Sequence, residues 1–563
     1  MEGDLRRRDT TARRLELAVD IGVTVFRVAG LAAIALVADH GAAARPETPD
    51  ETAIFLGVVG IAAFLWLVLS GCFGYGSARR SDWVALIPFC VALVVREAFT
   101  VHSIQELEIQ FVQGPVDKHS VVYPLLQMFF VPLVRDPQAF MMHINGVLGA
   151  LACLPMYLFV RRRLESRAAG FLCALFLATN PLVARFSPTD GPYALLLAAW
   201  FAGLALLSAR EINAGSIFGG GVLLGVAATV RIEGFVLLLA SFLMLDLRMV
   251  MDGVRRHRIV AVSTLLAIAA LVAVQIYFVL RYNRGNFPPM TFDSVTWLLA
   301  YNGRIFAALV VIGAGAGIVT RRWLGLFALI AMLVVIAPVG HSMHVAALHR
   351  LVPACALQAM IAGIGAYSLM VWAPRTGAWG WLATVPGTLV AFSLLAQHWN
   401  DLTRPYVFTE EYDLVRGHLA PGGVPPQHCT LIAFKPESDI DIHDFGQVVP
   451  GMRVLDCATS GCLAELSVGG CFYYVRSVTC YFHPAGVPPA CAVAGITERG
   501  DHLGCMNERS ASFERSVELE PVEVRTIDIW NTFAEASRNY PQRAEIGLFR
   551  VRPKPVAQHQ SRS

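Results

Sequence analysis

The chain has 563 residues, of which 55% are hydrophobic and only 15% are charged, and its formal net charge is +3. Soluble domains usually carry about 25% charged residues. The apolar residues gather in long runs before residue 397, which excludes a water-soluble globule, a disordered chain, a coiled coil and a small disulfide scaffold. The low net charge gives no sign of a nucleic-acid-binding protein. The composition therefore indicates a polytopic membrane protein with a soluble tail.

Apolar runs predict the membrane spans, because a helix needs about 20 mostly apolar residues to cross a bilayer core of ~30 Å. The thirteen predicted spans are 17–38, 52–73, 82–96, 139–160, 168–186, 193–209, 215–230, 234–250, 259–280, 303–319, 323–340, 351–371 and 378–397. The first has a basic leader, so a signal peptide is an alternative. Its length, with Asp20 and Arg27 inside it, favours an uncleaved anchor.

Arginine clusters predict the orientation, because cytoplasmic loops carry an excess of Lys and Arg. With the N-terminus inside, every second loop is basic through Arg6, Arg7, Arg8, Arg13, Arg14, Arg79, Arg80, Arg161, Arg162, Arg163, Arg167, Arg210, Arg255, Arg256, Arg258, Arg321, Arg322 and Arg375. An odd number of spans then places the tail outside the cytoplasm. Frequent Ala, Leu, Val and Arg suggest a bacterium, hence an inner-membrane protein with a periplasmic tail.

Three domains are predicted from this topology: a two-span extension at 1–81, a transmembrane domain at 82–397 and an extracytoplasmic domain at 398–563. The last is predicted to be mixed α/β. Its expected elements are a helix near 409–419 and strands at Cys429–Phe434, Cys471–Phe482, Ser516–Ile527 and Glu545–Val551.

Seven of the twelve cysteines lie in the tail: Cys429, Cys457, Cys462, Cys471, Cys480, Cys491 and Cys505. Because disulfides persist in oxidising compartments, this density supports an extracytoplasmic tail. An odd number leaves at least one thiol unpaired or paired elsewhere. A zinc site is the alternative, with His428, His443, His483 and His502 nearby. No C-x-x-C spacing occurs, so disulfides are favoured.

Ionisable residues near membrane spans are candidates for function, because burying a charge in lipid is costly. Here they collect on the predicted outer side. They are Glu97, His102, Glu106, Glu108, Asp117, Lys118 and His119 in the loop 97–138, then Asp190, Arg231, Glu233, Arg281, Arg284, His341, His344, His349 and Arg350.

Each candidate also has a structural explanation. Glu97 can form an interfacial ion pair with Arg96, and Asp190 can cap a helix or initiate a turn. Glu106 and Glu108 can lie on a solvated helix face. The three histidines of 341–349 can ligate a metal, but interfacial histidines explain them better. Arg231 and Arg350 have little loop around them, which favours a functional role.

Several short motifs follow one another over residues 82–371. They are Lys118-His119-Ser120-Val121-Val122-Tyr123-Pro124-Leu125-Leu126 after an acidic outer loop, the exit Arg161-Arg162-Arg163-Leu164, the turn from Asn180-Pro181 to Asp190, Val230-Arg231-Ile232-Glu233-Gly234, and His349-Arg350-Leu351-Val352-Pro353. In this order the chain resembles the GT-C superfamily of membrane glycosyltransferases, near protein O-mannosyltransferases, aminoarabinose transferases and RgtA/B/C/D-like enzymes. It departs from the family at the start of the first outer loop, where the family usually has Asp-Glu and this chain has Arg96-Glu97 at the nearest position.

The resemblance implies a GT-C-like helical catalytic domain. It also implies transfer of a sugar from a polyprenyl-phosphate carrier to an acceptor hydroxyl at the outer face. The general base would be Glu97, Glu106 or Glu108, with Asp190 orienting the substrates. Cations for the lipid phosphate would be Arg231 and Arg350, with the remaining expected binding residues Lys118, His119, Tyr123 and Glu233. A single displacement would invert the anomeric carbon.

The implied partners are the lipid-linked donor, membrane lipid and a glycan, lipid or protein acceptor, with no nucleic acid. No cofactor is assigned from the sequence; a divalent cation stays open, with no ligands assigned. A transporter is the main alternative, although it predicts sequence repeats and charges near span midpoints. A non-catalytic sensor or scaffold is the third interpretation, and it leaves the acidic loop without a role.

Overall fold

The computed structural model describes the chain in separate ranges. These are residues 80–100, 102, 123, 137–189, 191–209, 212–282, 301–320, 323–336, 351–372, 384–403, 407–419, 426, 428–434, 445, 449, 451–456, 466, 470–481, 483, 491, 502–528 and 543–553. The predicted spans 17–38 and 52–73 lie outside them. The chain divides into two compact units, of which the first holds the helices up to Leu402 and the second holds the tail from Thr403 onward.

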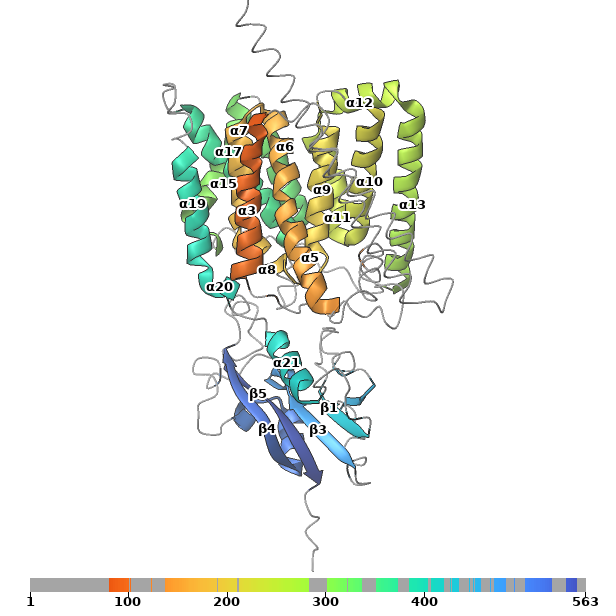
Figure 1. Ribbon diagram of the computed structural model, residues 1–563, viewed down its shortest axis with the longest axis vertical. Helices are drawn as coiled ribbons and strands as arrows, with labels where there is room; N and C mark the ends of the chain where they lie inside the picture. The colour runs from red at the N-terminus through yellow and green to blue at the C-terminus, as the bar shows by residue number, and fades with distance from the viewer. Residues whose placement is uncertain are drawn as a thin grey trace, which may run out of the picture. The chain divides into compact units, whose positions relative to one another are not determined.

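The first unit is helical, and its longer helices run side by side in Figure 1. The elements are η1 (Arg80–Ala85), α3 (Leu86–Val94), η2 (Val95–Phe99), α5 (Pro137–Leu151), α6 (Cys153–Leu164), α7 (Arg167–Thr179), α8 (Pro181–Phe186), α9 (Tyr193–Leu207), α10 (Ala214–Val230), α11 (Ile232–Met244), α12 (Leu247–Arg256), α13 (Arg258–Tyr282), α15 (Arg304–Thr320), α16 (Leu324–Ile336), α17 (Val352–Trp372), α19 (Thr384–Gln397) and α20 (Trp399–Thr403).

Two helices in the described ranges are long and apolar enough to cross a membrane. They are Met141–Leu164, which runs through α5 and α6, and Val352–Val371 in α17. The pair α11 and α12, bent by 95°, forms a third if it is counted as one span. Shorter apolar segments of this unit include Arg167–Thr179, Tyr193–Leu207 and the Arg258–Ala273 part of α13. The thirteen spans therefore stay a prediction, although spans 139–160 and 351–371 coincide with these two helices.

Polar capping residues divide two of the predicted spans. The segment 168–186 is two helices, because Asn180 is extended and its side-chain oxygen accepts a hydrogen bond from the Val183 N–H that begins α8. The segment 234–250 ends at Met244, and Asp246 caps the N-terminus of α12. An apolar run alone does not show these breaks, because each depends on one side chain satisfying the first main-chain donors of a new helix.

Glycines let α15, α16 and α17 approach one another at backbone distance. A Cβ atom at Gly313 would lie 2.0 Å from the Ile361 carbonyl oxygen, and one at Gly365 would lie 2.0 Å from that of Leu309. Gly325 of α16 meets the Gly313 carbonyl in the same way, at 2.1 Å. Small residues at helix crossings are the usual device of membrane bundles, in which lipid supplies no hydrophobic drive for helix association.

The second unit is a mixed α/β domain. Its elements are α21 (Val407–Leu419), β1 (Cys429–Ala433), β2 (Arg453–Asp456), β3 (Cys471–Arg476), η5 (Val478–Tyr481), α25 (His502–Cys505), α26 (Glu508–Ser516), β4 (Val517–Asp528) and β5 (Arg543–Pro553). The sheet order is β2-β1-β3-β5-β4 (Figure 1). Strand β1 pairs in parallel with β2 and β3, and β5 pairs antiparallel with β3 and β4.

The expected helix and strands of the tail are present, with one boundary error. Strand β3 ends at Arg476, and the chain then turns into η5 instead of continuing to residue 482. The buried carboxylate of Glu411 accepts a hydrogen bond from the Val478 N–H at the start of that turn. The sequence analysis missed β2, which has only four residues, and α26, whose polar sequence ERSASFERS lacks a continuous apolar stripe.

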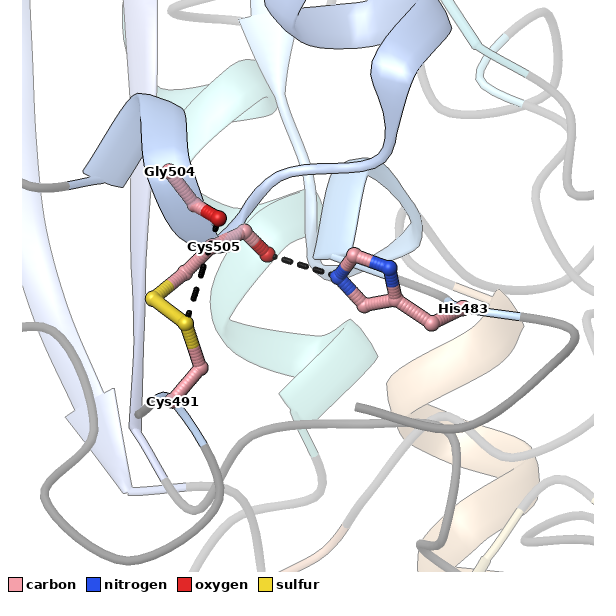
Figure 2. Close-up of a disulfide and its surroundings, with 4 residues drawn as sticks. All are labelled: His483, Cys491, Gly504 and Cys505. Carbon is pink, nitrogen blue, oxygen red and sulfur yellow. Dashed lines mark hydrogen bonds between the residues drawn. A yellow bond between two sulfur atoms is a disulfide. The ribbon is translucent and has the colours of Figure 1, made fainter. Parts of the chain in front are cut away.

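Two disulfides lie among the described cysteines of the tail. Cys429–Cys471 joins directly paired positions of β1 and β3. Cys491–Cys505 fixes α25, and Figure 2 shows the His483 ring against the Cys505 carbonyl, with Nε2 2.9 Å from that oxygen. Cys480 is buried as a free thiol.

The disulfide interpretation of the tail cysteines is thus supported for four of them, and the zinc alternative gains no support. In the described part of the tail, no three His, Cys, Asp or Glu side chains are grouped closely enough to hold a metal ion. His443, one of the four histidines considered, lies outside the described residues.

The glycine contacts predict a stability difference between two positions on α15. Gly313→Ala should lower the free energy of unfolding by roughly 1–3 kcal/mol, because its methyl group would collide with the main chain of α17. Gly315→Ala is the control, since a Cβ there would meet nothing within 4 Å. Thermal unfolding of both variants in detergent measures the difference, and equal midpoints would contradict the close approach.

Glu411 predicts a pH dependence of the tail. Burial raises the pKa of Glu411 to about 8, from an ordinary value of 4.5. Between these values the unfolded chain is ionised and the folded chain keeps the proton, so the tail loses stability as pH rises. Glu411→Gln retains an oxygen for the Val478 N–H and does not titrate. The stability of the variant relative to the wild type should therefore increase as the pH rises from 5 to 8. Hydrogen exchange in β3, corrected for the intrinsic exchange rate at each pH, measures this, and it should become slower in the variant than in the wild type. A difference that does not change with pH would refute the prediction.

Candidate functional site

Glu97 lies in η2, where α3 widens into a π-helical turn before it ends. Its neighbour Arg96 is fully buried and donates to the carbonyl oxygens of Ala92 and Ala178 at 3.2 Å and of Leu177 at 3.4 Å. The expected ion pair between Arg96 and Glu97 is therefore replaced by bonds from Arg96 to the last turn of α7. That end of α7 carries partial negative charge, which suits a guanidinium. Glu97 remains partly exposed at the surface of the bundle.

Two histidines surround the Glu97 carboxylate. His143 Nδ1 on α5 lies 2.7 Å from Glu97 Oε2, and His102 Nε2 lies 3.5 Å from the same oxygen. The two imidazole rings meet edge to face, with centroids 4.2 Å apart. Burial, followed by the neighbouring His143, lowers the pKa of His102, which favours its neutral form. The sequence analysis noted His102 but gave it no role, and it missed His143.

Gly146 makes room for the carboxylate against α5. A Cβ atom at this position would lie 1.9 Å from Glu97 Oε1 and 3.5 Å from Pro188 Cβ. One turn further along α5, a Cβ at Gly149 would collide with the side chain of Ser187. These glycines therefore let η2 and the turn that begins at Ser187 share one face of α5. Glu97 lies beside that turn as a result.

Asn145 fixes the turn that contains Asp190. Its Nδ2 donates to the Thr189 carbonyl at 2.7 Å, to the Gly191 carbonyl at 3.1 Å and to the Tyr123 hydroxyl at 2.6 Å. Asp190 itself lies outside the described residues. Both of its neighbours are nevertheless held to α5, at the position adjacent to Gly146. The amide of Asn145 thus joins the Asp190 turn to the Glu97 region.

Arg231 lies at the break between α10 and α11, in extended backbone. Its side chain is only 3% exposed. The guanidinium carbon lies 5.0 Å over the ring of Tyr193, the first residue of α9, and Nε lies 3.6 Å from Glu233 Oε2. Gly234 completes the motif, because a Cβ there would lie 1.9 Å from the Ala227 carbonyl oxygen. The motif thus holds the buried Arg231 guanidinium at the N-terminus of α9, the helix that follows the Asp190 turn.

The described part of the site includes Glu97, Tyr123, Arg231 and Glu233 from the sequence-based candidates. Two further candidates, His102 and the backbone of Arg281 in α13, are also described. Outside the described residues lie Glu106, Glu108, Asp117, Lys118, His119, Asp190, Arg284, His341, His344, His349 and Arg350. The sequence analysis missed His143 and Asn145. It also missed Gly146, which leaves room on α5 for the Glu97 carboxylate. Both polar residues fall inside the predicted span 139–160, where an ionisable or amide side chain is unusual, and this signal could have identified them.

Several solved structures are similar to this chain. The crystal structure of ArnT from Cupriavidus metallidurans in the apo state matches with a TM-score of 0.45 and 13% identity, covering 70% of this chain and 93% of that one. The Archaeoglobus fulgidus oligosaccharyltransferase in the apo form matches with a TM-score of 0.42 and 11% identity, covering 72% and 71%. No protein-family model and no curated protein sequence matches the chain. At these values neither structure assigns a residue or a reaction to it.

The Asn145 hydrogen bonds predict a local change on substitution. Asn145→Ala leaves the carbonyls of Thr189 and Gly191 without their amide donor, at a cost of about 1–3 kcal/mol for each buried acceptor. Amide hydrogen exchange of the peptide 187–193 should therefore accelerate by about tenfold or more. Tyr123→Phe is the control, because it removes only the hydroxyl acceptor. Exchange that is unchanged in Asn145→Ala would show that the amide does not hold the turn.

Proposed function

We propose that this protein is a GT-C-type membrane glycosyltransferase that moves a sugar from a polyprenyl-phosphate carrier to an acceptor hydroxyl, with inversion, at the outer face of a bacterial inner membrane. One observation carries the proposal. The Asp190 turn is held by Asn145 beside Glu97, and it leads into α9, whose first residue packs under Arg231. These contacts link described parts of three motifs of the resemblance, Glu97, the two residues flanking Asp190 and Arg231, and this linkage supports the proposal.

The first chemical requirement of such a transfer is a general base, which a carboxylate can supply. An acceptor hydroxyl is a weak nucleophile, so a base must accept its proton during attack. In the proposal this base is Glu97, Glu106 or Glu108, and Asp190 orients the acceptor or the sugar. Glu97 is supported by its place beside the Asp190 turn and by its partial exposure, which leaves it accessible to a substrate.

Cations answer the second requirement. The leaving group is a lipid phosphate, which is already a stable anion, so the reaction needs positive charge at that phosphate more than a general acid. Arg231 suits this role because a guanidinium stays charged even when it is buried and can bind two phosphate oxygens at once. Arg350, Lys118, His119 and Tyr123 complete the proposed donor site. Glu233 beside Arg231 orients the guanidinium.

The membrane answers the third requirement. A polyprenyl chain stays in the bilayer, so its phosphate reaches only an active site at the membrane boundary. Among the described residues of the proposal, Glu97 lies at the end of a helix and Arg231 at a helix break, where such a boundary is expected. In this topology the N-terminus is cytoplasmic and the tail is periplasmic, available to an acceptor of glycan, lipid or protein nature.

Native mass spectrometry of the detergent-solubilised protein tests the proposal with polyprenyl phosphate as the ligand. The wild type should bind it saturably, and Arg231→Ala should bind at least about tenfold more weakly, because a charge-assisted hydrogen bond is lost. Arg304→Ala, an exposed arginine at the start of α15, should bind as the wild type does. Arg350→Ala tests the second cation in the same way.

Two results would contradict the proposed donor site. Equal binding by the wild type and Arg231→Ala would remove Arg231 from the phosphate site. A folded wild type that binds no polyprenyl phosphate would reject the carrier-dependent reaction, and a transporter would then explain the buried charges better.

A further inference from the structure

Three potential metal ligands converge in the described part of the chain, at Glu97, His102 and His143. One carboxylate oxygen and one nitrogen of each imidazole lie within 4.8 Å of one another. No other three His, Cys, Asp or Glu residues meet this condition among the residues whose positions are described. The sequence analysis placed its metal alternatives elsewhere, at residues 341–349 and in the tail. Tertiary structure alone assembles this group.

The distances are close to those of a tetrahedral site. Metal–ligand bonds of about 2.0–2.1 Å place neighbouring ligand atoms roughly 3.3 Å apart. His102 Nε2 is already 3.5 Å from Glu97 Oε2. His143 Nδ1 is closer, at 2.7 Å, so it would move outward by about half an ångström. The His143 side chain is 56% exposed, which leaves it free to make this movement.

Two atoms of the group have unused bonding capacity. Glu97 Oε1 and His102 Nε2 are both buried, and neither forms a hydrogen bond with any of the described residues. Buried polar atoms in native proteins are nearly always paired, so such atoms call for an explanation. A simple hydrogen bond between His143 and Glu97 accounts for Oε2 alone. A cation bound at Oε2 would also satisfy the His102 nitrogen.

The backbone holds the group in place from two elements. Thr100 closes η2 by donating its N–H and its hydroxyl to the Val95 carbonyl, both at 2.9 Å, and this turn returns His102 toward Glu97. His143 comes from α5, with Gly146 one helical turn further along leaving space for the carboxylate. Glu97 and His143 lie on two helical elements, η2 and α5, which hold them in register better than a single loop would, and His102 follows η2 in the sequence.

We propose that Glu97, His102 and His143 bind one divalent transition-metal ion of the zinc type. Imidazole nitrogens suit zinc and its neighbours, whereas magnesium and calcium prefer all-oxygen sites. Two histidines and one glutamate leave a fourth tetrahedral position open, as in exchangeable rather than closed structural sites. Binding requires His143 as the tautomer with its proton on Nε2, so that the Nδ1 lone pair faces the ion.

Metal binding itself does not depend on the proposed transfer reaction, but its catalytic consequence rests on that function. A Glu97 carboxylate bound to a metal is a poor proton acceptor, because the ion competes for the same lone pairs. With the metal present, Glu106 or Glu108 would act as the base, and Glu97 would instead serve as a metal ligand beside the Asp190 turn. The metal proposal thus assigns Glu97 a role different from that of a general base.

Zinc binding by the full-length protein tests the proposal. The protein, purified without a histidine tag, is stripped with chelator, loaded with Zn²⁺ and assayed for bound metal by elemental mass spectrometry after gel filtration. The wild type should retain one more Zn²⁺ per chain than Glu97→Gln or His143→Ala, with affinity at least about tenfold higher. His257→Ala, a histidine between α12 and α13, should match the wild type. Zinc held by the tail would be common to all four proteins.

The visible absorption of bound cobalt provides a second readout of the metal site. Co²⁺ bound to the wild type should give the visible absorption of a four-coordinate N/O site, and Zn²⁺ should displace it. Gly146→Ala should weaken that signal, since its methyl group would displace the Glu97 carboxylate without removing a ligand.

The proposal is overturned if stripped wild type takes up no more Zn²⁺ than the folded Glu97→Gln protein, or if Co²⁺ gives only an octahedral, aquo-type spectrum. Should His143→Ala fail to fold, Glu97→Gln and the cobalt spectrum decide the question. Loss of polyprenyl phosphate binding with zinc binding intact would reject the proposed function and leave the metal site standing. The reverse pattern would reject only the metal site.

Discussion

The hydrogen bonds of one buried amide connect the parts of the candidate site. Asn145 donates to both carbonyls that flank Asp190 and to the Tyr123 hydroxyl. A main-chain turn within an apolar bundle needs such a donor, because lipid and packed side chains offer none. The same helix provides Gly146, beside Glu97, and His143, which contacts that carboxylate. Helix α5 is therefore the element on which the acidic loop and the acidic turn are brought together.

Close backbone approach is the second constraint on this bundle. Gly146 on α5, Gly234 on α11 and Gly313 on α15 each lie where a methyl group would come within 2.0 Å of an atom of another element. At α11 this explains a motif, because Gly234 lets the helix begin against α10 while Arg231 stays extended, with its guanidinium over the Tyr193 ring. The glycine and the buried arginine thus have separate roles, the first in packing and the second in charge. In the proposed function only the charged Arg231 guanidinium contacts the substrate.

Local sequence patterns predicted the tail well where the pattern is strong. Short β-like stretches between Gly/Pro turns predicted β1, β3, β4 and β5, and cysteine composition indicated disulfides. Strand β2 was missed because four residues are too few for periodicity, and it is stabilised by parallel pairing with β1. The end of β3 was misplaced because a tertiary contact from Glu411 ends it, and no residue near Arg476 signals that contact.

From sequence alone, composition and charge determined that this is a membrane-type helical chain with a mixed α/β tail, and ordered motifs indicated the carboxylates and arginines of the candidate site. These features are local or compositional, so no coordinates are needed to recognise them. Only the tertiary structure decided that Arg96 bonds α7 instead of Glu97, and that His102 and His143 surround the Glu97 carboxylate. His143 and Glu97 are 46 residues apart, and helix packing, which no local pattern encodes, brings them together.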